Sequence, residues 1–145
     1  MTPHEALALL RGTTEAWVED EFSDVVWAGE YESRWGIRMA QRARDFTTIW
    51  FDVGEITVRY EAFLLPTPPH NQSDVYRYCL TRSRTTWPAT IVADRRGELY
   101  VAGRIPLGIL TADTIDGAVG AVYDVVDSSF RTLLRMGFQS REKSV

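Results

Sequence analysis

Residues 46–66 constrain the fold of this chain more than any other stretch, because two runs of alternating apolar and polar side chains flank a turn. The sequence is FTTIWFDVGEITVRYEAFLLP, with the turn at Gly54–Glu55. Period-two alternation places each set of side chains on one face of a sheet, and β-branched and aromatic residues suit such a surface. Glycine gives the backbone freedom that a hairpin turn needs. The stretch is therefore predicted to be an antiparallel hairpin.

The composition is that of a globular domain without a strongly basic surface. Of the 145 residues, 45% are hydrophobic and 25% are charged, which is enough apolar surface for a core. The net charge of −4 argues against binding of nucleic acids or anionic membranes, since both need a basic face. The single cysteine, Cys79, excludes an intrachain disulfide, and the N-terminus lacks a signal-peptide pattern. We expect a cytoplasmic protein with a reduced thiol.

A helix and a third strand are predicted ahead of the hairpin. Thr2 can cap the helix, Pro3 suits its first position, and Glu5 completes a capping box. Residues 34–40 alternate again and read as a strand, so three antiparallel strands follow one another. Residues 22–33 are open to two interpretations, a short strand or a packed surface loop.

The C-terminal half predicts a helix, a second hairpin and a long helix. Turn and cap residues set the boundaries of these elements. The predicted elements are a helix from Asn71, strands at 90–94 and 98–105, and a helix from Thr111 or Asp113 that ends at Gly137. The predicted order is α-β-β-β-α-β-β-α. It indicates an α+β fold, with a mostly antiparallel five-stranded sheet and helices on one face. Residues 1–138 form a single predicted domain, and residues 139–145 form a polar tail.

Several segments resemble the YbjN family, small proteins also described as type III secretion chaperone-like. The matching runs are LPTPPHN at 65–71, VYR at 75–77, GELYVAGRIPL at 97–107, DGAVGAVY at 116–123, VDSSF at 126–130 and RMGF at 135–138. The first 33 residues match poorly. The resemblance implies a chaperone-like α+β fold, frequent dimerisation and no known catalytic residues.

The sequence offers no catalytic or metal-binding set of residues. His4 and His70 lie in unrelated contexts, and neither has the spacing of a metal site. Cys79 has apolar helical neighbours, which favours a core thiol over a nucleophile. Asp124 and Asp127 share a helix face, where a solvated face is far commoner than a carboxylate dyad. We therefore expect no enzyme activity, no cofactor and no metal.

The face of the sheet opposite the helices carries aromatic and arginine side chains of the types enriched at protein interfaces. The candidate partner-binding residues are Trp50, Arg59, Phe63, Tyr100 and Arg104. Two interpretations are open at this point. The face could be exposed for a partner, or Trp50, Phe63 and Tyr100 could be covered by residues 22–31 of the same chain.

The resulting hypothesis is a non-enzymatic protein-binding module, chaperone-like or regulatory, that forms a homodimer and binds another protein. Replacing Trp50 and Phe63 together should then weaken partner binding without a large loss of stability. The rival hypothesis is a small-molecule sensor or enzymatic domain. Its pocket would lie between the sheet and the last helix, lined by Gly117, Gly120 and Tyr123.

Overall fold

The computed structural model describes residues 1–139, which form one antiparallel sheet and three α-helices. In chain order the elements are α1 (Pro3–Glu19), β1 (Val25–Tyr31), β2 (Arg34–Ala40), β3 (Phe46–Val53), β4 (Thr57–Leu65), α2 (Gln72–Ser83), β5 (Thr90–Ala93), β6 (Leu99–Pro106), the 3-10 turn η1 (Leu107–Ile109) and α3 (Ala112–Phe138). The sheet order is β1-β2-β3-β4-β6-β5. The α+β class is confirmed, but the prediction of five strands is wrong, because the sheet has six. The predicted tail lies outside the described residues apart from Gln139.

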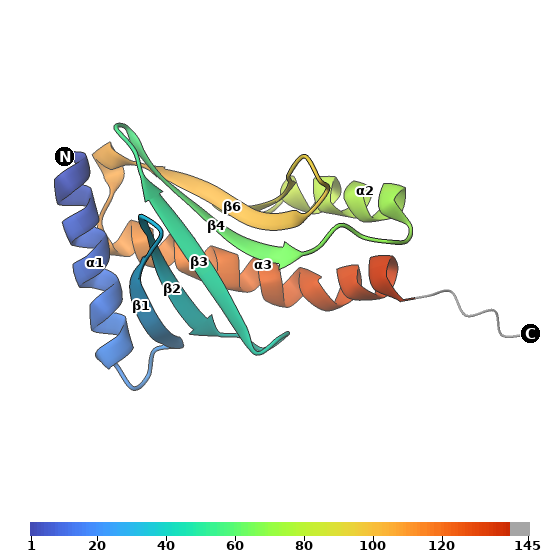
Figure 1. Ribbon diagram of the computed structural model, residues 1–145, viewed down its shortest axis with the longest axis horizontal. Coiled ribbons are helices and arrows are strands. Elements are labelled where there is room, and N and C mark those ends of the chain that lie inside the picture. Colours follow the sequence, from blue (N-terminus) through green and yellow to red (C-terminus); the bar gives the residue numbers. More distant parts are fainter. Residues whose placement is uncertain (140–145) are drawn as a thin grey trace, which may run out of the picture.

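The helices cover one face of this sheet. Figure 1 shows α3 running behind the strands, α1 beside β1, and α2 at the opposite end beside β5 and β6. All five strand pairs are antiparallel. One face of the sheet therefore packs on helices, and the other face has no helix over it within residues 1–139.

The additional strand is β1, the segment that the sequence left open between strand and loop. It joins β2 through Glu32 and Ser33, which both have left-handed backbone conformations with φ of 50° and 66°. A two-residue hairpin turn of this kind normally uses Asn or Gly at such positions. A β-bulge near Val25 also interrupts the alternation of buried side chains. Both features remove the usual sequence signals of a hairpin.

The predicted helix starts are largely confirmed. Thr2 and Glu5 form the capping box of α1, and Thr111 forms a second capping box with Thr114 at the start of α3. Gly137, however, is not a residue beyond the helix end: it lies inside α3 and is buried. A Cβ there would come within 2.9 Å of Pro68, so the glycine permits close packing of α3 on the segment that leaves β4.

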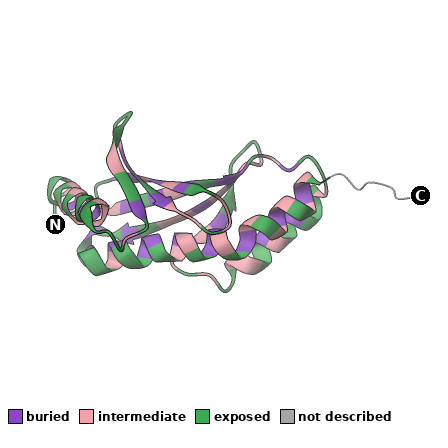
Figure 2. Cartoon of the chain, turned by 90° about the horizontal axis from the view of Figure 1, so that it is seen from below, coloured by how far each residue is buried: buried purple, intermediate pink, exposed green. Residues whose placement is uncertain are grey.

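The core lies between the helices and the covered face of the sheet, where Figure 2 shows buried residues on both α3 and the strands. Its largest fully buried side chains are Phe51, Leu10, Ile37, Met39, Ile49, Leu64, Leu99, Ile115 and Leu133. A polar contact orients α1 on this core, because the indole N–H of Trp35 donates to Oγ1 of the buried Thr14 at 2.9 Å. The alternate apolar side chains of β2 and β3 and the apolar stripe of α3 all face this core.

Two large apolar side chains lie outside the core. Leu80 points away from it and is 73% exposed, whereas Val75 and Cys79 of the same helix are buried. Ile56 belongs to the β3–β4 turn and is 77% exposed. A register shift after Phe63 also lets both leucines at the end of β4 be buried.

A polar cluster attaches the β2–β3 connection to α3. Oδ1 of Asp127 accepts hydrogen bonds from Nε2 of Gln41 and from the backbone N–H of Ala43, each at 2.9 Å. Burial alone would raise the pKa of Asp127, but these hydrogen bonds outweigh it and hold that pKa below its usual value. Asp127 therefore has a structural partner and does not form a dyad with Asp124.

Candidate functional site

The face of the sheet opposite the helices, called the open face here, is formed by alternate residues of all six strands. Its principal side chains are Trp27, Tyr31, Arg34, Arg38, Thr48, Trp50, Asp52, Arg59, Glu61, Phe63, Val92, Tyr100 and Arg104. The strand positions beside them supply the buried core. The period-two alternation of the sequence thus determines which side chains lie on the open face.

An aromatic cluster occupies the β1–β3 end of the open face. The ring of Trp50 has its centroid 6.3 Å from that of Trp27 and 6.1 Å from that of Tyr31. Gly29 and Gly36, which are cross-strand partners, lie beneath these rings. A Cβ on Gly36 would lie only 2.5 Å from Cζ3 of Trp50, so the absence of a side chain lets the indole lie on the backbone.

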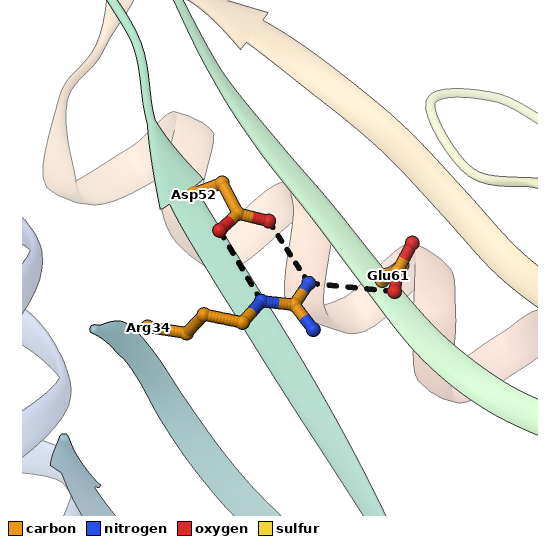
Figure 3. Close-up of polar contacts among 3 residues, drawn as sticks. All are labelled: Arg34, Asp52 and Glu61. Atoms are coloured by element: carbon orange, nitrogen blue, oxygen red, sulfur yellow. Dashed lines mark hydrogen bonds and ion pairs between the residues drawn. The ribbon is translucent and has the colours of Figure 1, made fainter. Parts of the chain in front are cut away.

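An ion-paired arginine lies next to this cluster (Figure 3). Nε and Nη2 of Arg34 donate to the two carboxylate oxygens of Asp52 at 3.2 and 2.9 Å. The same Nη2 is 3.4 Å from a carboxylate oxygen of Glu61. The guanidinium also lies 5.8 Å from the ring centroid of Trp50. Such planar, bidentate contacts fix the orientation of the guanidinium on the open face.

The third part of the open face is a hollow of about 610 Å³, called the arginine hollow here. It is lined by Arg34, Asp52, Arg59, Tyr60, Glu61, Trp87, Pro88, Thr90, Val92, Ala102, Gly103 and Arg104. The hydroxyl of Tyr60 donates to the carbonyl oxygen of Pro88 at 3.1 Å, which holds the segment before β5 against the sheet. Burial raises the pKa of Tyr60 to about 12. This phenol therefore stays protonated and keeps its donor role at neutral pH.

A partly exposed aromatic pair lies where β4 pairs with β6. The rings of Phe63 and Tyr100 are 5.6 Å apart in an edge-to-face arrangement, and Phe63 is 43% exposed. The neighbouring strand places Val92, 42% exposed, opposite Tyr100. Edge-to-face pairs are a favoured aromatic geometry, so the exposed ring has a defined position.

The structure places all five predicted partner-binding residues on the open face. Arg59 and Arg104 are direct cross-strand partners, as are Phe63 and Tyr100, whereas Trp50 lies in the separate aromatic cluster. Residues 22–31 cover the face only in part. Val25–Tyr31 of this segment form the edge strand β1, and Trp27 and Tyr31 contact the ring of Trp50.

The predicted binding residues do not include Trp27, Tyr31 and Arg34 of the open face, nor Trp87, which lines the arginine hollow. The first two belong to β1, and their period-two spacing with Gly29 was the available signal. The contact of Arg34 with Asp52 depends on strand register, and the position of Trp87 depends on a loop. Neither could be found by periodicity.

The alternative pocket is not where the sequence predicted it. Gly117 and Gly120 lie on the exposed side of α3, and an added Cβ on either would meet no atom within 4 Å. Gly120 and Tyr123 line a hollow of about 320 Å³ between α3 and the connection from α1 to β1. Gly117 and Gly120 therefore do not lie in a pocket between α3 and the sheet.

The remaining reactive groups do not form a catalytic arrangement within the described part of the chain. Cys79 is buried on α2, and burial raises the pKa of its thiol to about 11. Residues 1–139 contain no cluster of three His, Cys, Asp or Glu side chains suited to a metal ion. None of their helices is long and apolar enough to cross a membrane.

A comparison with protein families matches residues 15–135 to YbjN, described as a putative bacterial sensory transduction regulator. The chain belongs to the YbjN family. The match includes β1 and most of the N-terminal part that carried little resemblance in the sequence motifs. All six strands, and thus the whole open face, lie within the region that defines YbjN membership.

Curated relatives occur in mycobacteria. An uncharacterized protein of Mycobacterium tuberculosis (strain ATCC 25618 / H37Rv) is 42% identical over 88 residues, which is 61% of this chain and 48% of the relative. An uncharacterized protein of Mycobacterium leprae is 37% identical over 94 residues, 65% of this chain and 51% of the relative. The YbjN chain thus spans about half the length of the curated relatives that it matches.

The fold also resembles a solved structure from a secretion system. A chain of the heterodimeric ExoU–SpcU complex, from the type III secretion system of Pseudomonas aeruginosa, superimposes with a TM-score of 0.54 at 15% identity. The alignment covers 68% of this chain and 81% of that chain. The predicted link between YbjN and a type III secretion chaperone-like fold is confirmed; at this identity the similarity concerns the fold.

Proposed function

We propose that this YbjN chain is a non-enzymatic protein-binding module of the cytoplasm, a chaperone-like or regulatory adaptor that binds its partner on the open face. The observation that carries the proposal is an uncovered sheet face with exposed aromatic side chains held in fixed positions. Tyr31 is 60% exposed and Phe63 is 43% exposed, and each contacts another aromatic ring. Rigid aromatic and arginine side chains supply most of the binding energy at protein interfaces.

The comparisons support this proposal in two ways. The YbjN family is described as a putative sensory transduction regulator, a role that requires contact with another molecule. The solved structure with a similar fold comes from a complex of two different proteins. Neither description names an enzymatic activity.

Co-purification with matched variants tests the proposal. The tagged chain is expressed in the organism that encodes it and compared with Tyr31→Ala/Phe63→Ala on the open face. The control is Leu80→Ala/Ile109→Ala, which removes two other exposed apolar side chains, from α2 and η1. The control should melt close to the wild type, because exposed positions without special contacts usually change the free energy of unfolding by no more than about 0.5 kcal/mol. The open-face variant also loses two aromatic contacts, worth about 0.5–1.5 kcal/mol each, so it should melt somewhat lower and is assayed at a temperature at which it is folded.

The expected result is one protein that co-purifies in constant proportion with the wild type and the control, and is lost from the open-face variant. Equal recovery with all three chains would refute the open face as the binding surface. The proposal also includes a homodimer, which light scattering of the isolated chain tests. A monomeric mass would refute the homodimer and leave the rest of the proposal unchanged.

A further inference from the structure

The arginine hollow contains a charge arrangement that the fold itself leaves incomplete. In the sheet register, Asp52 is opposite Arg59, and Arg59 is opposite Arg104. The two carboxylate oxygens of Asp52 are engaged by Arg34, which also reaches Glu61 (Figure 3). Within residues 1–139, neither Arg59 nor Arg104 forms an ion pair. Two guanidinium groups therefore face the hollow side by side without an anionic partner.

This arrangement is unfavourable for the isolated chain. Like charges directly opposite each other on neighbouring strands destabilise a sheet. A bound anion would remove that repulsion, and guanidinium groups match the geometry of a carboxylate through paired N–H donors. The unpaired arginines are thus an unfavourable feature of the free protein that a ligand can convert into a favourable one.

The charge count of the hollow favours one carboxylate over a polyanion. Three arginines and two carboxylates line it, which leaves a net charge of +1. A single aspartate or glutamate neutralises that charge, whereas a nucleic acid or a multiply charged phosphate would meet Asp52, Glu61 and a chain whose net charge is −4. The open face as a whole is more basic than the chain, with four arginines against two carboxylates.

An apolar group lies at the same site. Trp87 lines the hollow and is 85% exposed, and Pro88 and Val92 line it too. A large exposed indole next to unpaired arginines can contact an apolar side chain adjacent to the carboxylate. The next residue, Pro88, accepts a hydrogen bond from the hydroxyl of Tyr60 at 3.1 Å, which attaches this loop to the sheet. The hollow therefore combines one acidic subsite with one apolar subsite.

We propose that the arginine hollow binds an acidic segment of the protein partner, with one Asp or Glu carboxylate between Arg59 and Arg104 and a neighbouring apolar side chain on Trp87. This inference rests on the proposed function and assigns the partner's chemistry at one part of the open face.

The test uses a displayed library of random linear peptides, selected on the wild-type chain. Selected peptides are then synthesised in two forms, as recovered and with each Asp or Glu replaced by its amide. Their dissociation constants are measured by fluorescence anisotropy for the wild type, Arg59→Gln/Arg104→Gln and Tyr31→Ala/Phe63→Ala. The control, Arg95→Gln/Arg96→Gln, removes the same charge from the exposed β5–β6 turn, outside the hollow.

The expected peptides carry Asp or Glu beside an aliphatic or aromatic residue. Replacing the acid by its amide, or both hollow arginines by glutamine, should weaken binding about tenfold or more, because hydrogen bonds to charged groups are the strong ones. The turn control should bind as the wild type does. An equal loss in the turn control would indicate general electrostatics and overturn the proposal, as would the recovery of no peptides or of peptides without acids.

The variants separate the failure of this inference from failure of the proposed function. Peptides that need Tyr31 and Phe63 but not the hollow arginines would leave the open face as a binding surface and refute the acidic subsite. Peptides insensitive to both pairs would count against both ideas. Tighter binding of a single-stranded oligonucleotide, or a dimer that Arg59→Gln/Arg104→Gln dissociates, would assign the hollow to a different occupant and overturn the proposal.

Discussion

Gly36→Ala is the sharpest perturbation of the aromatic cluster, because it adds one carbon beneath two indole rings. The new Cβ would lie 2.5 Å from Cζ3 and 2.7 Å from Cε3 of Trp50, and 3.1 Å from Cζ3 of Trp27. Ordinary van der Waals contact begins at 3.4 Å, so restoring it requires Trp50 and the new Cβ to separate by about 0.9 Å (3.4 − 2.5). The backbone of Gly36 has no positive φ, and the strain is therefore purely steric.

The expected cost follows from two opposing effects. Overpacking of a well-packed site typically costs about 1–3 kcal/mol, and an indole lifted by nearly 1 Å loses a substantial part of its dispersion contacts. Replacing glycine by alanine in a strand returns about 0.5–1 kcal/mol through lower backbone entropy of the unfolded chain. We expect a net loss of ~1–2 kcal/mol in the free energy of unfolding.

Urea unfolding and near-ultraviolet circular dichroism measure the two consequences. Gly36→Ala should lower the urea midpoint without changing the slope, and it should alter the tryptophan signal. Gly12→Ala is the matched control, since it lies in α1, is exposed, and has no atom within 4 Å of the added Cβ. That variant should be more stable than the wild type by up to ~1 kcal/mol. A Gly36→Ala protein with an unchanged midpoint and an unchanged tryptophan spectrum would refute the packing assigned to the cluster.

Three further predictions concern the hollow, the β2–β3 connection and the thiol. Gly103→Ala should lower the free energy of unfolding by about 1–3 kcal/mol, and the urea midpoint with it, because its Cβ would clash with Oη of Tyr60 and lie 2.6 Å from the Pro88 oxygen; an unchanged midpoint would contradict the contact. The folded-state pKa of Asp127 is lowered, so its stabilisation is present above the unfolded pKa of about 4 and is lost as pH falls through the folded value. Asp127→Asn should therefore reduce unfolding free energy at neutral pH and flatten its decline in acid, and parallel pH curves would argue against this role. With a pKa of about 11, against 9.0 for an unperturbed thiol, Cys79 should react with iodoacetamide at pH 8 roughly 100-fold more slowly in the native protein than in urea; similar rates would mean that the thiol is accessible.

The sequence predicts the parts of the fold that depend on local patterns. The capping box at Thr2, the hairpin of β3 and β4, and the apolar stripe of α3 each follow from a spacing that local geometry enforces. The sequence does not decide whether β1 is a strand, because its turn uses Glu32 and Ser33 at positive φ, where sequence rules expect Asn or Gly. The pairing of β1 with β2 closes this turn, and no local pattern in the sequence shows that pairing.

In the candidate site, too, local patterns predict some residues and long-range contacts determine the others. Period-two alternation was enough to place Arg59 and Phe63 on the face away from the core, and the structure puts both there. The ion pair of Arg34 with Asp52 joins residues 18 positions apart, and it follows from strand register. Trp87 reaches the hollow through a loop. Those positions depend on long-range contacts, which is why periodicity could not predict them.

Site-specific photo-crosslinking tests the central proposal, a partner on the open face, most directly. A photoreactive phenylalanine analogue is placed at Phe63 on the open face or at Leu80 on α2, both exposed, in cells of the encoding organism. Irradiation should join the Phe63 position to one discrete protein, and the Leu80 position should give no such product. A product of the same size from Leu80, with none from Phe63, would contradict the assignment and move the binding surface to the helices.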